Sequence, residues 1–275
     1  YDSLAVSTRR LSSGLRVGTA ADDAAGLAIR ELMRADIHSI NQGVRNANDA
    51  ISMIQTADGA LQVVDEKLIR MKELATQAAT GTYTSDQRLI IDSEYQAMAS
   101  EITRIASATD FNGIYLLNGN LSGTTHDGTG LNPIGKIKIH FGTGNSSAED
   151  YYFINIGNST ASALGLGMGA AGRAGRSIST QELAQLALDK INTAIVSKDK
   201  IRAALGSTQN RLSNTIQNLQ IQAENLQSAE SRISDADVAT EMTEFVRQQI
   251  LTQSAVAMLS QANSLPKMAM QLIQG

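Results

Sequence analysis

The sequence predicts a mainly α protein in which both chain ends form a long antiparallel helical rod or coiled coil, with a small β-hairpin region at its centre. Two observations predict the rod: residues 37–78 and residues 205–233 each carry one narrow apolar stripe. The third concerns residues 113–177, which are rich in glycine and contain two runs that alternate with period two. Since neither helix can bury its own stripe, we expect the two stretches to pack against each other.

The stripe of residues 37–78 follows steps of three and four residues, which keep one side of a helix apolar. At about 1.5 Å per residue, this stretch forms a rod of roughly 60 Å. Around Ile54 two steps of three follow each other, a phase slip that locally overwinds a supercoil without ending the helix. The members of the stripe are Ile37, Ile40, Val44, Ala47, Ile51, Ile54, Ala57, Leu61, Val64, Leu68, Met71, Ala75 and Ala78.

Capping residues predict where the N-terminal helices begin and end. Residues 1–13 form a short amphipathic helix that stops before a glycine. Asp22 and Asp23 are placed to cap a helix that restarts near Ala24, because short carboxylates accept hydrogen bonds from the free N–H groups of a first turn. We expect this second helix to continue to about Thr80.

Similar signals bound the later helices. Ser85 or Asp86 is expected to cap a helix that ends before the turn sequence of residues 110–113. In the C-terminal half, Ser179 and Glu182 match a capping box, so we expect a helix to begin there.

The central region predicts a β-hairpin. In the first alternating run Ile137, Ile139 and Phe141 share one face, and in the second run Tyr152, Ile154 and Ile156 do so. The residues between the runs are of the types that form loops. Because two strands alone are marginally stable, we expect the hairpin to pack on the helices.

The composition excludes several classes of protein. The net charge is −4, with 23 Lys and Arg against 27 Asp and Glu, so we expect no nucleic-acid partner. There is no cysteine, which rules out disulfides and thiolate metal sites. No run of 18 apolar residues occurs, and no cleavable secretory signal is visible, so we expect no membrane insertion.

The sequence contains no arrangement of residues that indicates an enzyme. The three histidines, at positions 38, 126 and 140, are far apart and belong to no H-E-x-x-H motif, so we expect no metal site. Residues 167–172 match G-x-G-x-x-G, but the next helix starts well after them, so we interpret them as a loop. No nucleophile lies beside a base in any recognisable pattern. We therefore expect neither catalysis nor a cofactor.

Short motifs at both ends of the chain carry a resemblance to a known family. The sequence resembles bacterial flagellin, of a short-insert type that lacks large outer domains. Each motif alone is short, but together they occur in the same order as in that family. They are residues 11–16 (LSSGLR), 21–28 (ADDAAGLA), 58–61 (DGAL), 71–77 (MKELATQ), 110–113 (DFNG), 231–237 (SRISDAD), 239–242 (ATEM) and 262–266 (ANSLP).

The resemblance implies a structural subunit that self-assembles into the bacterial flagellar filament, the propeller for motility. It implies an inner coiled-coil layer of residues 1–30 with 240–275, and an outer rod of residues 31–239 that includes the insert. Flagellins usually begin further upstream than Tyr1, so part of the inner layer is expected to be missing. The alternative is a flagellin-like axial junction protein or a cell-surface binding protein.

The resemblance also implies a location and partners. Flagellins lie outside the cell, are exported by the flagellar type III apparatus and carry no cleaved signal peptide. Besides its own copies, the chain would meet an export chaperone at its C-terminal segment, and filament cap and junction proteins. The residues expected to serve assembly and chaperone binding are Met242, Phe245, Ile250, Leu259 and Leu265.

Arg70, Leu74 and Glu94 are candidates for receptor recognition. They match positions that flagellins present to the flagellin-sensing Toll-like receptor, and they are also candidates for contact between subunits. Ile69 stands where strongly recognised flagellins carry glutamine. The simpler interpretation is a set of solvated charges beside one leucine that flanks the apolar stripe.

Three asparagines fit the N-glycosylation pattern N-x-S/T: Asn120, Asn145 and Asn158. Such triplets are common by chance in loops rich in serine and asparagine. The resemblance adds that flagellins more often carry sugars on outer serine and threonine side chains.

Overall fold

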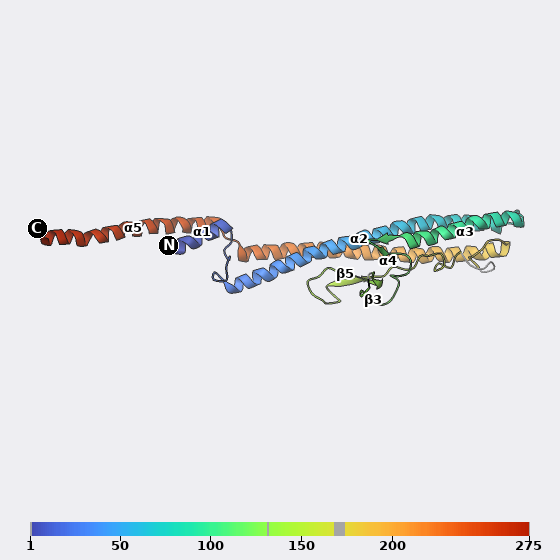
Figure 1. Cartoon of the computed structure of the whole chain (residues 1–275). Helices are drawn as coiled ribbons and strands as arrows, with labels where there is room; N and C mark the ends of the chain where they lie inside the picture. The colour runs from blue at the N-terminus through green and yellow to red at the C-terminus, as the bar shows by residue number, and fades with distance from the viewer. Residues whose placement is uncertain (1, 131, 168–173, 275) are drawn as a thin grey trace. The chain divides into compact units, whose positions relative to one another are not determined.

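The computed structural model of the chain describes residues 2–130, 132–167 and 174–274. Most of this chain is helical, which confirms the predicted mainly α class (Figure 1). The motif of residues 167–172 lies largely outside the described residues, so its interpretation as a loop stays a prediction. The helices are α1 Asp2–Ser13, α2 Ala24–Ala79, α3 Ser85–Ala108, α4 Gln181–Ser234 and α5 Val238–Gln274.

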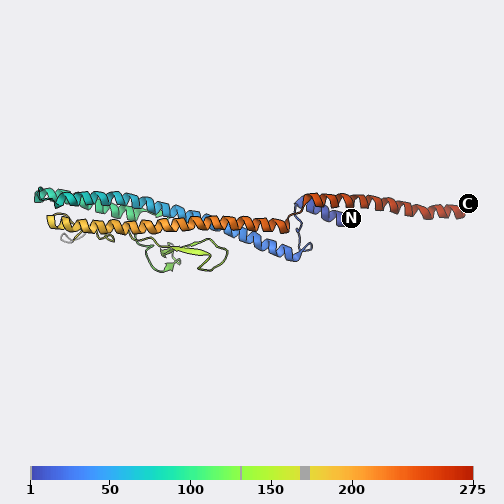
Figure 2. The same cartoon turned by 180° about the vertical axis from the view of Figure 1, so that it is seen from behind.

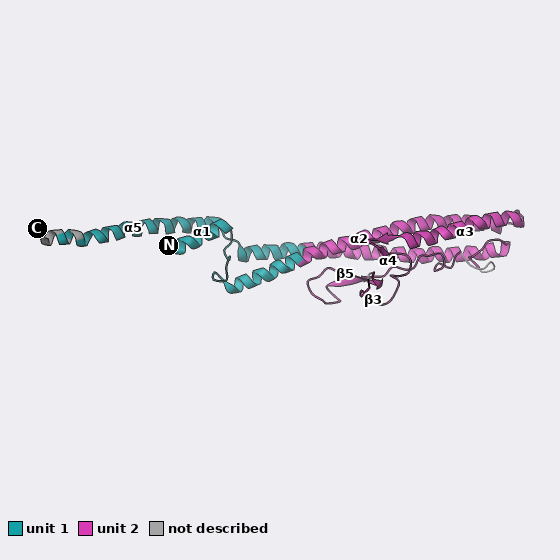
Figure 3. Ribbon diagram, viewed as in Figure 1, with its two compact units in different colours: residues 1–38, 221–275 teal, residues 39–220 magenta. Residues whose placement is uncertain are grey.

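Two compact units divide the described chain (Figure 3). The rod unit is Ser39–Gln220, and the terminal unit is the chain up to His38 together with the chain from Ile221 onward. Helices α2 and α4 contribute residues to both units. The predicted inner and outer layers concern a polymer, so the boundary between them stays a prediction.

In the rod unit both stripes are buried, but the predicted pairing of residues 37–78 with residues 205–233 is only half right. Residues 47–61 pack against the 205–216 part of α4, whereas residues 64–78 pack against α3 and residues 184–194 of α4. Helices α2, α3 and α4 lie side by side in both views (Figures 1 and 2). One apolar cluster, the α3-side core, joins Leu68 of α2 to Tyr95 of α3 and Ile191 of α4. The other, the hairpin-side core, joins Leu61 of α2 to Leu212 of α4 and to residues of the central region.

The predicted phase slip falls where α2 gains a second neighbour. Helix α2 continues unbroken through this region. Ala50 and Met53 are buried there beside Ile54 and Ala57, whereas Ile51 is only partly buried. The buried face of α2 is therefore wider than one stripe, because both α4 and the central region pack against α2 here.

The predicted hairpin is present. Strands β5 (Ile137–His140) and β6 (Tyr151–Ile154) are antiparallel, with Ile137 opposite Ile154. Two shorter pairs accompany it: β1 (Asp110–Phe111) with β2 (Ile114–Tyr115), and β3 (His126–Asp127) with β4 (Ile134–Gly135).

The turn predicted at residues 110–113 joins β1 to β2. Asn112 and Gly113 have φ angles of 52° and 79°. A two-residue hairpin turn of this kind needs positive φ at both positions, and asparagine followed by glycine is the sequence that adopts it most readily.

Two predicted N-caps are wrong by one residue. Helix α3 is capped by Thr84 instead of Ser85 or Asp86: Thr84 Oγ1 accepts from Gln87 N at 3.4 Å, and Thr84 N donates to Gln87 Oε1 at 3.0 Å. These bonds form a capping box. Thr84, Ser85 and Asp86 can all cap a helix, so the backbone geometry decides which of them does so.

Helix α4 begins at Gln181, with Thr180 as its cap. Thr180 Oγ1 accepts from Leu183 N at 3.2 Å, so the predicted box of Ser179 and Glu182 does not form. At α2 the prediction is half right. Asp23 Oδ1 accepts from Gly26 N at 2.9 Å, while Asp22 bonds to the preceding turn.

A glycine allows the hairpin to approach α2 closely. A Cβ atom at Gly43 would lie 2.0 Å from the carbonyl oxygen of Phe141. One turn further on, Asn46 Nδ2 donates to the His140 carbonyl at 2.8 Å. The end of β5 is therefore held directly against the helix backbone.

Gly43→Ala is expected to lower the free energy of unfolding by about 1–2 kcal/mol. Overpacking typically costs 1–3 kcal/mol, which outweighs the gain of up to ~1 kcal/mol in helix propensity. Gly59→Ala is the matched control, because Gly59 is also inside α2 but a Cβ atom there would meet nothing within 4 Å. It should stabilise by roughly 0.5–1 kcal/mol. Urea unfolding of both variants measures the difference, and equal shifts would contradict the close approach.

Candidate assembly and recognition surfaces

Two charged contacts join α2 to α4 where the two cores of the rod unit meet. Lys198, only 1% exposed, places its Nζ 2.5 Å from Asp65 Oδ1 and 2.8 Å from Asp199 Oδ1. Four residues later, Arg202 binds Asp58 with two hydrogen bonds, of 2.7 and 3.2 Å. Shifting either helix would break both the Lys198–Asp65 and the Arg202–Asp58 contact, so these contacts favour one register of the two helices.

Arg202 also sets the ionisation of its partner. Its hydrogen bonds lower the pKa of the Asp58 carboxyl below the usual value, because they favour the charged form. The Asp58 side chain is partly exposed, so water screens part of this effect.

The terminal unit is closed by backbone and arginine contacts. Ala236 N donates to Gly14 O at 2.9 Å, and Arg16 Nη2 donates to Ile233 O at 2.6 Å. Arg30 is 8% exposed and reaches both Val17 O, at 3.1 Å, and Glu230 Oε1, at 3.4 Å. These bonds hold the segment before α2 against the end of α4.

Helix α5 presents a long apolar surface to solvent. Helix α1 packs against it, and Arg10 Nη1 lies 3.8 Å from Glu241 Oε2. Most of its large apolar side chains nevertheless remain between 44% and 72% exposed. Exposed patches of this kind usually mark an interaction site. The exposed apolar side chains of α5 are Val238, Met242, Val246, Ile250, Leu251, Val256, Met258, Leu259, Leu265, Met268 and Met270.

Helix α5 contains all five predicted assembly residues. Met242, Ile250, Leu259 and Leu265 are exposed, while Phe245 is partly buried. The sequence reasoning omitted Val246, Leu251 and Val256, although the same apolar character marks them. What binds this surface is not visible in a single chain, so its role stays a prediction here.

Arg70 and Glu94 lie together on the surface of the rod unit. Arg70 Nε and Nη2 donate to Glu94 Oε1 at 2.9 and 2.7 Å, and Arg70 Nη1 donates to Glu73 at 2.9 Å. Ile69 is 49% exposed beside them. These residues lie together on one surface, and its role in contact or recognition stays a prediction.

Leu74 corrects the prediction. It is 1% exposed and belongs to the α3-side core, so the expectation that it lies on an outer face is wrong. Helix α3 covers α2 at this level, which widens the buried face by one position beyond the stripe. On α3, Leu89 and Ile90 are exposed apolar residues that sequence reasoning missed. The sequence could have indicated their exposure, because both lie outside the apolar row of α3 that begins at Ile91.

The three predicted glycosylation asparagines differ in accessibility. Asn120 and Asn145 are exposed in loops. Asn158 is partly buried, and its Oδ1 accepts from both Thr160 N and Thr160 Oγ1, at 3.0 and 2.9 Å. Glycosylation at these asparagines stays a prediction.

The described residues contain no group of three His, Asp or Glu side chains that could hold a metal ion. None of the described helices is both long enough and apolar enough to cross a membrane.

Long terminal helices, two helical stripes packed together and an uncovered apolar terminal helix define a helical assembly subunit. Residues 2–122 match the profile described as the bacterial flagellin N-terminal helical region, and residues 188–273 match the C-terminal helical region. The chain belongs to the bacterial flagellin family. It is a structural subunit of the flagellar filament, which serves motility, and it self-assembles into that filament outside the cell.

Relatives match along nearly the whole chain. Flagellin FlaB1 of Treponema pallidum is 41% identical over 256 residues, which is 93% of this chain and 87% of that protein. A flagellin of Halalkalibacterium halodurans is 39% identical over 265 residues, 96% of this chain and 90% of its own length. The crystal structure of Bacillus cereus flagellin is 30% identical, covers 68% of this chain and 94% of that one, and has a TM-score of 0.49.

Acid should weaken the rod unit partly through Asp58. Because its pKa is lowered on folding, the carboxylate contributes stability above its unfolded pKa of about 4, and this is lost as the pH falls through the folded value. In Asp58→Asn, the free energy of unfolding should fall less steeply below about pH 4 than in the unaltered chain. Urea unfolding at several pH values measures this. Arg202→Gln should flatten the slope in the same way, and an unchanged slope in both variants would contradict the assignment.

Proposed function

We propose that α5, with α1 against it, forms the contact that drives polymerisation. In the polymer the apolar surface of α5 packs against the same segment of neighbouring copies. The inner layer then consists of residues 1–30 and 240–275, and residues 31–239 form the outer rod. No catalytic role is part of this proposal.

The exposure of α5 is the observation that carries the proposal. Fully burying one large apolar side chain contributes roughly 1.5–3 kcal/mol, and the described side chains of α5 include eleven that are at least 44% exposed. When two different faces of α5 meet in neighbouring copies, the contact does not close on itself and repeats without limit, which produces a helical filament.

Before assembly the same surface needs cover. We propose that an export chaperone binds α5, and that the chain leaves the cell through the flagellar type III apparatus without a cleaved signal. Three exposed methionines, Met258, Met268 and Met270, support this, because flexible thioether side chains adapt to a helix-binding groove. Filament cap and junction proteins would meet the growing and basal ends of the polymer.

The surface of Ile69, Arg70 and Glu94 is proposed to contact the flagellin-sensing Toll-like receptor. Arg70 and Glu94 are exposed and already paired, so they offer a charge pattern of fixed geometry. Leu74 is not included, because it is buried in the α3-side core.

Arg70→Ala is therefore expected to reduce the signal in receptor reporter cells at least fivefold, the response to about 1 kcal/mol of lost binding. Arg104→Ala is the matched control. Arg104 is also an exposed arginine, and its Nη2 lies 2.6 Å from a carboxylate oxygen of Glu101. It lies near the C-terminal end of α3, away from Glu94. Equal signals from Arg70→Ala and the unaltered chain would contradict the proposed surface.

Ile250→Glu is expected to raise the critical concentration for polymerisation more than tenfold. Ile250 is 57% exposed in the subunit, and assembly would have to bury a charge in its place. The adjacent, exposed Gln249 gives the matched control Gln249→Glu, which adds the same charge. Sedimentation of seeded filaments measures both variants, and circular dichroism verifies that the subunit keeps its helices. If Ile250→Glu polymerised at the same critical concentration as the unaltered chain, this would count against α5 as the driving contact.

A further inference from the structure

The methionines of the chain differ sharply in exposure. Met242, Met258, Met268 and Met270 of α5 are 46%, 72%, 49% and 60% exposed. Elsewhere among the described residues, every methionine is buried or half-buried. The exposed thioethers of the described chain are therefore confined to the helix whose apolar surface is proposed to drive assembly.

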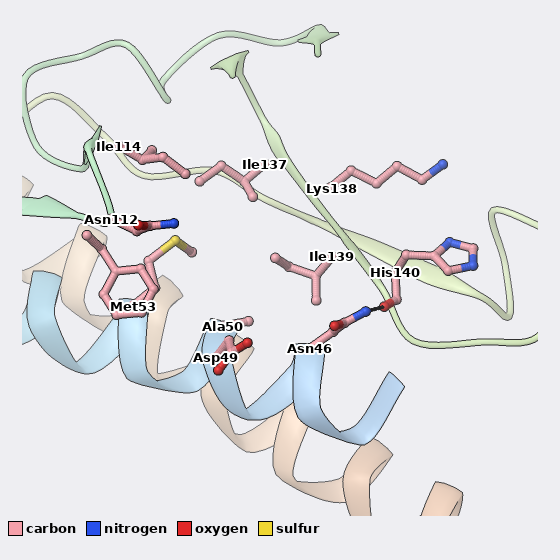
Figure 4. A pocket seen from close by; sticks show the side chains of 11 residues that line it. Asn46, Asp49, Ala50, Met53, Asn112, Ile114, Ile137, Lys138, Ile139 and His140 are labelled. Atoms are coloured by element: carbon pink, nitrogen blue, oxygen red, sulfur yellow. Dashed lines mark hydrogen bonds between the residues drawn. The ribbon is translucent and has the colours of Figure 1, made fainter. Parts of the chain in front are cut away.

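The fold covers the methionines of the rod unit. Met71 is buried in the α3-side core. Met53 lines a groove of about 370 Å³ between α2, the β1–β2 hairpin and β5, and Figure 4 shows it with Ile137 and Ile139 around the space between helix and strand. Even there, only 3% of Met53 is exposed. An oxidant dissolved in water therefore reaches the sulfurs of α5 more readily than those of the rod unit.

The exposed methionines belong to an apolar surface that extends around α5. Val246 follows Met242 by one turn, and Leu265 precedes Met268 by one turn, all of them exposed. Met242 and Met258 point to nearly opposite sides, because their separation in sequence turns the helix by about 160° between them. A helix that is apolar all round is buried on all sides once its contacts are complete. Assembly through α5 therefore removes these thioethers from water.

Hydrogen peroxide would change the character of this surface. The thioether sulfur attacks one peroxide oxygen, so an S–O bond forms as the O–O bond breaks. The proton on the transferred oxygen moves to the departing oxygen, which leaves as water. The sulfur is oxidised by two electrons and the peroxide is reduced by two. The product, methionine sulfoxide, is polar and accepts hydrogen bonds, whereas the thioether is apolar.

We propose that Met242, Met258, Met268 and Met270 form a modification site at which peroxide blocks polymerisation of the free subunit. The inference rests on the proposed function, because it concerns regulation of the α5 surface. In the free subunit the sulfoxide oxygens stay in water, so the fold is kept. In the polymer they lose that water against an apolar surface that offers no donor, which opposes assembly. Finished filaments resist the reaction, because their thioethers are already covered.

Dilute hydrogen peroxide on the unaltered free subunit tests the proposal. After catalase removes the peroxide, peptide mass spectrometry locates each added oxygen, circular dichroism verifies the helices, and sedimentation of seeded filaments gives the critical concentration. We expect the α5 methionines to react before Met53 and Met71, and the critical concentration to rise at least about tenfold. The two methionine sulfoxide reductases should restore the original value. An unchanged critical concentration after oxidation of α5, or a rise that the reductases do not reverse, would overturn the proposal.

Two variants assign the effect to α5. The first carries Met242→Leu, Met258→Leu, Met268→Leu and Met270→Leu. Leucine has similar volume and cannot be oxidised, so the ratio of its critical concentrations after and before peroxide should be close to one. The matched control, Met33→Leu with Met98→Leu, replaces half-buried methionines and should keep the ratio of the unaltered chain. Both variants retain Met168, which lies outside the described residues, and an equal ratio in the two would overturn the proposal.

Treatment of finished filaments separates this inference from the proposed function. The same peroxide dose should oxidise the α5 methionines at least about tenfold more slowly in filaments than in the free subunit, because a covered sulfur is out of reach of the oxidant. Equal rates would contradict the burial of α5 in the polymer, and with it the proposed function. Slow oxidation in filaments together with normal assembly of the oxidised subunit would overturn the inference alone.

Discussion

The packing of α2 against α4 is the interaction on which the rest of the structure depends. Leu61 of α2 and Leu212 of α4 lie in one core, and Leu68 and Ile191 lie in the other. Each helix alone exposes a stripe that water disfavours, and neither is stable at that length without tertiary contact. Helix α3 and the central hairpins then cover further parts of α2 beside those that α4 covers.

Apolar packing of this kind leaves the alignment of two long helices underdetermined. A stripe that repeats every three or four residues can slide by one repeat with little loss of burial. The pairs Lys198 with Asp65 and Arg202 with Asp58 remove that freedom, because only one alignment pairs all four charges. The central hairpins therefore face the part of α2 that contains Gly43, where the backbone can approach closely.

Much of this architecture follows from periodicity. Steps of three and four residues determine which side of α2 and α4 is buried, and alternation determined the inward face of β5 and β6. Leu74 shows where such reasoning fails. It is outside the stripe, and its burial depends on α3 covering the same level of α2, which no pattern within α2 reveals. The prediction of the N-cap of α3 was wrong for a different reason. Three consecutive residues there, Thr84, Ser85 and Asp86, have side chains that can cap a helix.

The candidate surfaces were predictable to different degrees. The apolar character of α5 was evident from its sequence, although how much of it stays uncovered was not. The groove could not have been predicted, because it forms between segments about 60–90 residues apart in the chain. Only the fold brings Met53 and Ile137 together.

The side chain of Arg88 ties α3 to the end of α2, since its Nε and Nη2 donate to the carbonyls of Ala78 and Thr80, and this tie has a thermodynamic consequence. A chain corner between two helices ordinarily samples many conformations, and a partner that selects one of them loses affinity through the lost entropy. Arg88 has already restricted this corner within the free subunit. Any partner that meets the neighbouring Leu89 and Ile90 therefore binds a surface whose conformational freedom was removed during folding.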